Sequence, residues 1–438
     1  MVLSQGSWTL RDFANRVFLS RYSKEAMAAA LPSGILLLTL CMFFVGVLYY
    51  TNAFVAQYSG AGRLRRIGAS LWQGLWLAVL CSLITCLFYP LAPVVFAVFD
   101  HAPEVQRLEI EYFRIAVWGQ IPWYGMIVLG TFYSGRGRTV PIMIVNALAA
   151  GANIALDYLL ILGPIGLPQY GIRGAAVAMV TGNVVGCVCY AVMIFRRDNE
   201  ERYGVCSQWR VDAELMKRLV RFGSPQGVQF FLDVSAFTVF VLLVGRYGAD
   251  ALTASTLALN LNTFAFLPMI GLEVATSTLV GKYIGAGRPD LARQCVRRCF
   301  ALTFGYMSTV ALAFLIIPDV FVNIYGGPET LAEFESVRPI AVVLLRFVGF
   351  YCFFDSAYIV FSAAVKGAGD TAFAMRASVV SSVLFIAVLY LLSVQWRTSL
   401  YWPWTVFTLF VVVMGLVYGA RYVQGKWEKM RVIEGTGG

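Results

Sequence analysis

The amino-acid sequence predicts an all-α membrane protein with twelve transmembrane helices, the first of them truncated, in two pseudo-symmetric six-helix bundles. Of its 438 residues, 59% are hydrophobic and 13% are charged, whereas soluble domains carry about 25% charged residues. Apolar segments of the ~20 residues that a helix needs to cross a bilayer recur along the chain. Long apolar runs such as 34–47 and 377–392 lack the alternation of a membrane β-barrel.

We predict each helix from its apolar run and from the Gly, Pro and charged residues beside it. The helices cover residues 1–20, 27–58, 68–99, 107–134, 139–162, 173–196, 219–244, 251–281, 294–322, 338–365, 371–394 and 401–422. They form an amino-terminal lobe (1–200) and a carboxyl-terminal lobe (219–425). A polar linker (201–218) joins the lobes, and a tail (426–438) follows the second.

The charge pattern indicates topology. Lys and Arg number 34 against 24 Asp and Glu, for a net charge of +10. If both termini are cytoplasmic, most Lys and Arg fall in cytoplasmic loops, whereas the acids divide almost evenly between the two sides. Positive charge in short loops sets the orientation of a membrane protein. We therefore expect a multi-pass protein of the cell inner membrane, surrounded by lipid, with both termini cytoplasmic and no nucleic-acid partner.

The two halves of the chain repeat one another. Tyr58–Arg63 corresponds to Tyr283–Arg288, and Gly135-x-Gly137-x-Thr139 corresponds to Gly367-x-Gly369-x-Thr371. Because each half has an even number of helices, the halves share one orientation and are related by an axis along the membrane normal. These glycines lie where helices leave the membrane, so we expect them to adopt positive φ and to end the helices.

The repeat also indicates that the first helix is short. The seventh helix begins near Leu219, and the position that corresponds to it in the first half would lie before Met1. We expect Met1 to be an internal methionine of a longer natural chain. The alternative is a degenerate first helix that lies at the membrane interface.

Other chemistry is not indicated. The nine cysteines are scattered without flanking His or Cys at metal-ligand spacing, and no phosphate-binding G-x-x-x-x-G-K-[ST] motif occurs. The one histidine, His101, lies beside Asp100 in an outer loop, where we expect a solvated loop residue rather than a pH sensor. We therefore expect no catalytic residue, no metal and no cofactor. The chain is not an enzyme in this interpretation, and its energy source is a proton or sodium gradient.

Carboxylates inside the predicted helices are the candidate functional groups, because a charge at membrane depth costs ~2.5–3.5 kcal/mol on insertion scales. Five acids qualify: Asp12, Asp157, Asp233, Glu273 and Asp355. Asp233 and Asp355 lie mid-helix among aromatic residues. A buried carboxylate of this kind can exchange a proton for a cation, which is the chemistry of an antiporter.

Three further features leave alternatives open. Asn153 and Asp157 share one helix face, so they form either a cation site or a hydrogen bond between helices. Glu273 either faces a cavity or pairs with an arginine such as Arg346. Aromatic faces attract organic cations, so Trp123 and Phe354, together with Glu273, are candidates for a substrate cleft.

Several segments in order resemble one family of transporters. They are Phe13–Leu19 with Glu25–Ala29, Gly60-Ala61-Gly62, Asn153–Tyr158, Gly171–Ala176 and Gly367-Ala368-Gly369-Asp370-Thr371. Together they look like the multidrug and toxic compound extrusion (MATE) transporters, NorM-like branch, over nearly the whole chain. The resemblance implies two six-helix lobes around a cleft with alternating access, and export of small cationic amphipathic compounds in exchange for protons or sodium ions.

The resemblance also implies roles for individual residues. Asp233 and Asp355 look like the coupling acids of the second lobe, with Tyr351 beside the cation site. Asn153, Asp157 and Thr181 resemble ligands of a first-lobe cation site. The family commonly has an aspartate where this chain has Asn15, and Asp12, one turn earlier, is the candidate substitute. This departure favours coupling in the second lobe.

The main alternative function is a flippase for lipid-linked or other amphipathic substrates. A phosphate-bearing cargo calls for basic residues in the cleft, whereas the predicted spans carry more acids than bases. A membrane enzyme would need a constellation that one histidine does not supply, and discrete acids on one lobe fit alternating access better than a channel. We expect the transporter to act as a monomer.

Overall fold

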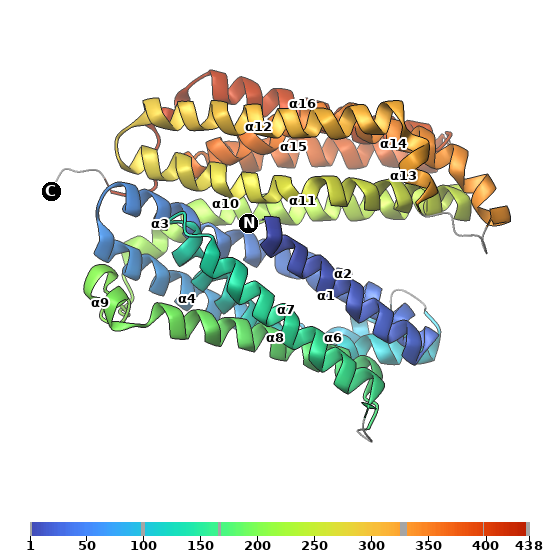
Figure 1. Ribbon diagram of the computed structural model, residues 1–438, viewed down its shortest axis with the longest axis horizontal. Coiled ribbons are helices and arrows are strands. Elements are labelled where there is room, and N and C mark those ends of the chain that lie inside the picture. Colours follow the sequence, from blue (N-terminus) through green and yellow to red (C-terminus); the bar gives the residue numbers. More distant parts are fainter. Residues whose placement is uncertain (1, 98–100, 165–167, 325–330, 397, 435–438) are drawn as a thin grey trace. The chain divides into compact units, whose positions relative to one another are not determined.

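The computed structural model describes residues 2–97, 101–164, 168–324, 331–396 and 398–434. Within these ranges the chain is almost entirely helical and contains no strand (Figure 1). Eleven segments of the described part are long and apolar enough to cross a membrane. The predicted fold class is confirmed, and the chain is a multi-pass membrane protein.

Unit 1 comprises residues 1–227. Its helices are α1 (Val2–Tyr22), α2 (Lys24–Tyr49), α3 (Thr51–Gly60), α4 (Leu64–Cys86), α5 (Ala92–Ala97), α6 (Pro103–Ser134), α7 (Val140–Leu162), α8 (Gly171–Ile194) and α9 (Arg197–Tyr203). α1 is helical over 21 residues, but it is not among the segments apolar enough to be counted as spans.

Unit 2 comprises residues 228–438. α10 (Ala213–Val244) begins in unit 1 and continues into unit 2. It is followed by α11 (Ala249–Gly285), α12 (Pro289–Ile316), α13 (Pro318–Asn323), α14 (Leu331–Ala368), α15 (Thr371–Tyr390) and α16 (Tyr401–Val423).

Each predicted helix has a counterpart, but several bounds were wrong. The ninth helix was predicted to span 294–322 and the tenth to begin at 338, whereas α12 spans Pro289–Ile316 and α14 begins at Leu331. The third predicted helix was extended to residue 99, whereas α4 ends at Cys86 and α5 begins after a turn. Pro90 lies in the turn between α4 and α5, and proline removes a backbone donor and interrupts a helix. The seventh helix was predicted to begin at 219, but α10 begins at Ala213, where Asp212 accepts a hydrogen bond from the Leu215 N–H (3.0 Å) as an N-cap does.

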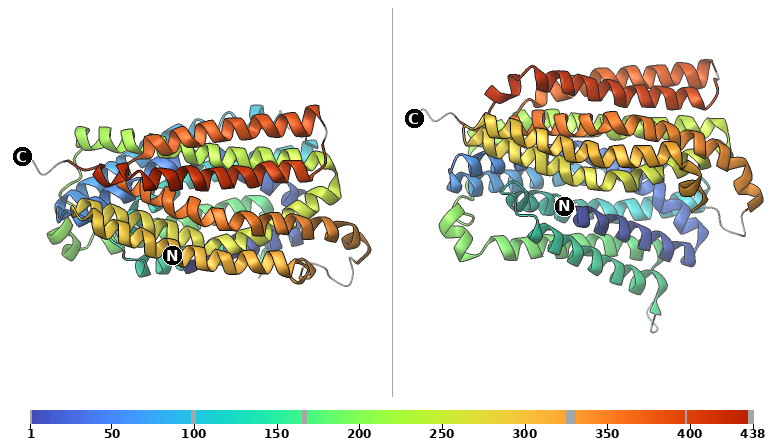
Figure 2. Two further views of the ribbon diagram at one scale, coloured as in Figure 1. Left: turned by 90° about the horizontal axis from the view of Figure 1, so that it is seen from above. Right: turned by 45° about the horizontal axis from the view of Figure 1, so that its top comes forward.

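Corresponding helices occupy the centre of each unit. In unit 1, α6 packs against α2, α4 and α8, and α7 packs against α1 and α8. In unit 2, α14, the repeat counterpart of α6, packs against α11, α12 and α16. Figure 2 shows from two further directions that the long helices of each unit run beside one another.

Four repeat glycines end helices in the same way. Gly62 (φ 71°) follows α3 and Gly287 (φ 70°) follows α11. Gly137 (φ 75°) follows α6 and Gly369 (φ 118°) follows α14. Only glycine enters this left-handed region without strain, so the predicted role of these motifs as helix ends is confirmed.

The segment 204–212 between α9 and α10 is held on α4. Three α4 side chains donate to its backbone carbonyls: Trp72 to Val205 (2.6 Å), Gln73 to Arg210 (3.0 Å) and Trp76 to Trp209 (2.9 Å). Arg66 Nη1 also lies 2.7 Å from Asp212 Oδ2. This connector is thus an ordered part of unit 1.

Candidate functional site

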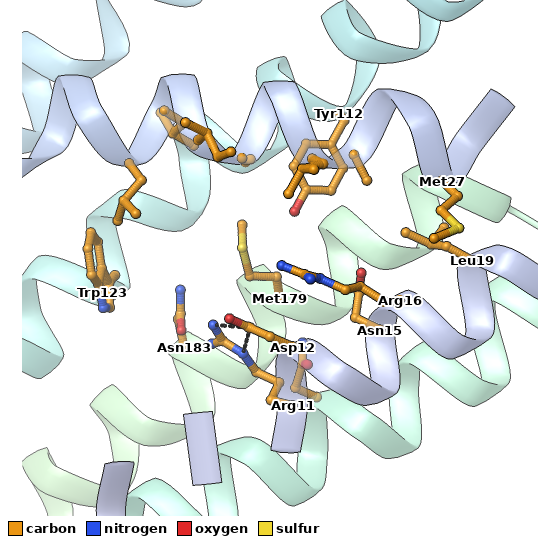
Figure 3. Close-up of a pocket in the computed structure, with 18 of the residues that line it drawn as sticks. Arg11, Asp12, Asn15, Arg16, Leu19, Met27, Tyr112, Trp123, Met179 and Asn183 are labelled. Atoms are coloured by element: carbon orange, nitrogen blue, oxygen red, sulfur yellow. Dashed lines mark hydrogen bonds and ion pairs between the residues drawn. The ribbon is translucent and has the colours of Figure 1, made fainter. Parts of the chain in front are cut away.

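Unit 1 contains a cavity of about 370 Å³ between α1, α2, α6, α7 and α8. Its polar and aromatic lining comprises Arg11, Asp12, Asn15, Arg16, Tyr112, Gln120, Trp123, Asn153 and Asn183. Figure 3 shows the side chain of Arg16 directed into this cavity, and Arg11 hydrogen-bonded to Asp12. The arginines were not predicted as part of a site, because they lie on the helix that was taken to be incomplete.

The structure brings Asn15 and Asp157 together. Asn15 Nδ2, on α1, donates to Asp157 Oδ1, on α7, over 3.2 Å. Asp157 is fully buried, and no described group donates to its second oxygen. Asn153, one turn earlier, is 2% exposed and its Nδ2 has no acceptor among the described residues. Asp157 therefore makes the hydrogen bond between helices that was one of its two predicted roles, and it retains one unbonded oxygen.

Thr181 does not join this group through any described contact. Its hydroxyl donates to the carbonyl of Val177 on its own helix, α8 (2.9 Å), and it does not line the unit 1 cavity. A hydroxyl that back-bonds to its own helix keeps its oxygen as an acceptor, so Thr181 stays a prediction as a ligand.

In unit 2, Asp233 bridges two helices. Its Oδ1, on α10, accepts a hydrogen bond from Ser378 Oγ on α15 over 2.9 Å. Gln229, one turn earlier on α10, is 1% exposed. A carboxylate oriented by a hydroxyl in this way is held in place and keeps lone pairs for a cation or a proton.

Asp355 lies on α14 and is 6% exposed. No described group donates a hydrogen bond or forms an ion pair with its carboxylate. Tyr351, one turn earlier, is 2% exposed, and its hydroxyl has no partner among the described residues. Buried polar groups are normally satisfied. The unsatisfied Tyr351 hydroxyl and the buried Asp355 carboxylate share one helix face, and this pair is therefore the strongest indication of a ligand in unit 2.

Glu273 pairs with a lysine rather than with an arginine. Lys366 Nζ, on α14, lies 2.8 Å from Glu273 Oε1 on α11. The suggestion of Arg346 as partner was wrong, and Arg346 is exposed. Lys366 itself was missed, because it lies one residue beyond the predicted end of its helix, where a lysine is normally a loop charge.

The two aromatic candidates have different surroundings. Trp123, on α6, is 8% exposed, lines the unit 1 cavity and stacks on Tyr124 with ring centroids 5.9 Å apart. Phe354, on α14, packs against Phe350 at 5.8 Å, and its backbone carbonyl approaches Gly415 on α16. The structure thus places Trp123 in a cavity and Phe354 at a helix contact.

Asp233, Asp355 and Tyr351 together have the chemistry of a cation site in unit 2. Carboxylate oxygens bind protons or hard cations, and the hydroxyl oxygen is a further acceptor. No set of three or more His, Cys, Asp or Glu side chains in the described ranges is arranged to hold a metal ion.

Comparisons with known proteins agree with this architecture. The chain is 25% identical over 433 residues to the "Probable multidrug resistance protein NorM" of Thermotoga maritima. The matched region covers 97% of this chain and 90% of that protein. It is 27% identical over 376 residues to the protein of the same name from Bradyrhizobium diazoefficiens, at 85% and 79% coverage.

Solved structures share the fold. An outward-facing multidrug resistance MATE family transporter of the MOP superfamily matches with a TM-score of 0.87 at 17% identity, over 98% of this chain and 95% of that one. A MOP superfamily transporter from Pyrococcus furiosus, described as having a binding pocket of reverse polarity, matches with a TM-score of 0.86 at 18% identity, with the same coverage. The family model MatE matches residues 1–159 and 225–391, which is more than half of the chain. The chain therefore belongs to the MATE family of transporters, in its NorM-like branch.

Proposed function

We propose that this chain is a secondary active transporter that exports small cationic amphipathic compounds in exchange for protons or sodium ions. The observation that carries the proposal is Asp355, a buried carboxylate without a described donor, beside the unsatisfied hydroxyl of Tyr351. An ionisable group inside a membrane protein indicates an ion pathway by default. Asp233 is the second coupling acid, and the multidrug-resistance names of the relatives support a drug-like substrate.

Coupling requires only that the ion and the substrate prefer different arrangements of the protein. Binding of a proton or sodium ion at Asp233 and Asp355 favours one arrangement, and substrate binding favours the other. The proton or sodium ion is the coupling ion in this scheme, no cofactor takes part, and the protein acts as a monomer.

Efflux of a fluorescent cationic dye from proteoliposomes tests the proposal, with proton and sodium gradients imposed separately. We expect one gradient to drive efflux and expect Asp233→Asn and Asp355→Asn to abolish it while the variants still melt cooperatively. Full efflux by Asp355→Asn would remove this residue from coupling. No efflux under either gradient would reject the antiporter.

One structural observation favours the alternative function, a flippase for lipid-linked or other amphipathic substrates. Arg11 and Arg16 line the unit 1 cavity, and arginine is suited to phosphate. The same proteoliposomes, loaded with a fluorescent phospholipid, test this alternative, because flipping without dye efflux would favour it.

The proposed inner-membrane location, with both termini in the cytoplasm, places the connector 204–212 in the cytoplasm as well. Cys206 lies there and is exposed, whereas the other eight cysteines are buried or half-buried. Partial burial and the neighbouring Glu200 raise the pKa of the Cys206 thiol, so labelling should accelerate with rising pH. An impermeant maleimide should label Cys206 in inside-out vesicles and spare it in intact cells, and the reverse would invert the topology.

A further inference from the structure

Lys366 places its ammonium group inside unit 2. It lies in the last turn of α14, where long basic side chains normally extend outward to the membrane interface. Its side chain is only 7% exposed, and Nζ lies 2.8 Å from Glu273 Oε1 and 5.9 Å from the centre of the Phe230 ring. A buried charge that turns away from water must be held by a specific partner.

The backbone fixes this inward position. Gly367 is packed so tightly against α11 that a Cβ there would lie 2.4 Å from the carbonyl oxygen of Ser277. Ser277 is one turn after Glu273 on α11, so the ion pair lies beside the close contact between α11 and α14. Lys366 is thereby held within ion-pair distance of Glu273.

Glu273 connects Lys366 to both proposed coupling acids. It is close enough to interact electrostatically with Asp233 and with Asp355, and Lys366 itself interacts with Asp233. The titratable groups that face this cluster are Asp233 from α10, Glu273 from α11, Asp355 and Tyr358 from α14, and Tyr418 from α16. Lys366 is the basic member of this group.

We propose that Lys366 is a tethered cation that competes with the coupling ion for the carboxylates of unit 2, and so sets the affinity of the ion site. The inference rests on the proposed antiport function. Three ionised acids and one lysine leave a net charge of −2, so the ammonium lowers the attraction for an incoming cation without cancelling it. Lys366 is a positioning residue, because it acts on the ion through Glu273 and Asp233.

The proposal predicts opposite effects for the two members of the ion pair. Lys366→Met removes the competitor and should tighten sodium or proton binding by about tenfold or more, as expected when a charge that interacts with the site's carboxylates is removed from a protein interior. Glu273→Gln frees the ammonium to interact with Asp233 and should weaken binding by a similar factor. The double variant restores the net charge and should bind within about threefold of the unaltered protein.

Binding is measured on the purified full-length protein, with sodium ions by calorimetry and with protons through the pH midpoint of dye efflux, where tenfold is one pH unit. Lys282→Met is the matched control, because Lys282 is an exposed lysine in the last turn of α11, and it should leave both readouts unchanged. If Lys366→Met fails to fold, Lys366→Met in the Glu273→Gln background leaves no unpaired charge and should still tighten binding relative to Glu273→Gln.

A merely structural ion pair gives a different result. Weaker binding in both single variants, or unchanged binding in a folded Lys366→Met, would overturn the role of Lys366 while gradient-driven efflux by the unaltered protein still upheld the antiporter. Absence of ion binding and of efflux in the unaltered protein would overturn both proposals.

Discussion

The two units carry different polar groups on one helical plan. In unit 1, the buried Asp157 has an amide partner, Asn15, at 3.2 Å, and Asp12 pairs with Arg11 at 3.1 Å. In unit 2, Lys366 pairs with Glu273 at 2.8 Å, and Glu273 in turn interacts electrostatically with Asp233 and Asp355. Since α6 and α14 occupy corresponding central positions, the bundle itself does not require the acid cluster. The difference between the units therefore points to function in unit 2.

The largest expected effect tests this assignment directly. Asp355→Asn should reduce gradient-driven dye efflux at least tenfold, which corresponds to a rise of about 1.4 kcal/mol or more in the activation free energy of transport, because the amide cannot be protonated. Asp157→Asn should reduce efflux by no more than about twofold, because its amide oxygen still accepts from Asn15. Initial efflux rates in proteoliposomes of equal protein content give both numbers, and equal losses in the two variants would erase the distinction between the units.

The second-largest expected effect is the loss of stability when a glycine at a close helix contact in either unit is replaced by alanine. Gly367 and Gly135 are repeat counterparts. An added Cβ would lie 2.4 Å from the Ser277 carbonyl oxygen at Gly367, and 2.7 Å from Val55 Cβ and 2.9 Å from the Asn52 carbonyl oxygen at Gly135. The closest backbone approach is tighter at Gly367, so Gly367→Ala should cost about 3 kcal/mol and Gly135→Ala about 2 kcal/mol.

Denaturant unfolding in detergent checks these costs. Gly305→Ala in α12 is the control, because nothing lies within 4 Å of the position its Cβ would take, and alanine there should raise stability by up to about 1 kcal/mol. An equal loss in the free energy of unfolding for Gly367→Ala and Gly135→Ala would show that the two helix contacts accommodate an added methyl group equally well.

A third experiment makes unit 1 more like unit 2. Asn15→Asp places a second carboxylate within hydrogen-bonding distance of Asp157, and two carboxylates at that distance cannot both ionise without a proton or cation between them. We expect the variant to bind one additional sodium ion or proton per molecule with an affinity in the millimolar range, about −4 kcal/mol. Calorimetric titration with sodium chloride measures the stoichiometry, and an unchanged value would mean that the unit 1 geometry cannot hold a cation.

The sequence predicted the helices well because their length and apolarity are set by the bilayer and can be read residue by residue. The repeat glycines were predicted for the same local reason, since only glycine accepts the backbone conformation that ends those helices. The proximity of Asn15 and Asp157 agrees with the family resemblance, which had grouped them at one site. Their contact joins α1 to α7, far apart in the chain.

The sequence could not predict whether long charged side chains point into the protein or outward. Lys366 and Arg16 are each compatible with a solvated or a buried position, and only the packing of neighbouring helices decides between them. The end of α4 was also misjudged, because the apolar run continues past Pro90 and the hydropathy hides the break. Three-dimensional neighbours, rather than composition, therefore determine the part of the site that the sequence missed.

The smallest expected effect concerns two ion pairs, one in each unit, that join a helix to a segment outside the long helices. In unit 1, Arg66 on α4 pairs with Asp212 at 2.7 Å, and in unit 2, Arg293 on α12, the repeat counterpart of α4, pairs with Glu428 at 2.7 Å. Partial burial raises the pKa of Asp212. The hydrogen bonds from the Leu215 N–H and the Arg66 guanidinium lower it by more, so the pKa of Asp212 lies below its ordinary value. Its stabilisation is therefore complete above the ordinary pKa and is lost as the pH falls through the lowered one.

Asp212→Asn should accordingly lower the free energy of unfolding by about 0.5–1 kcal/mol at pH 7, because the pair is partly exposed, and the deficit should disappear below about pH 3. Melting temperatures of the two proteins across this pH range measure the difference. Glu428→Gln is the matched variant in unit 2, with an expected cost of similar size. A much larger cost for Asp212→Asn alone would show that the ion pair in unit 1 also supports α10, which continues from the connector into unit 2.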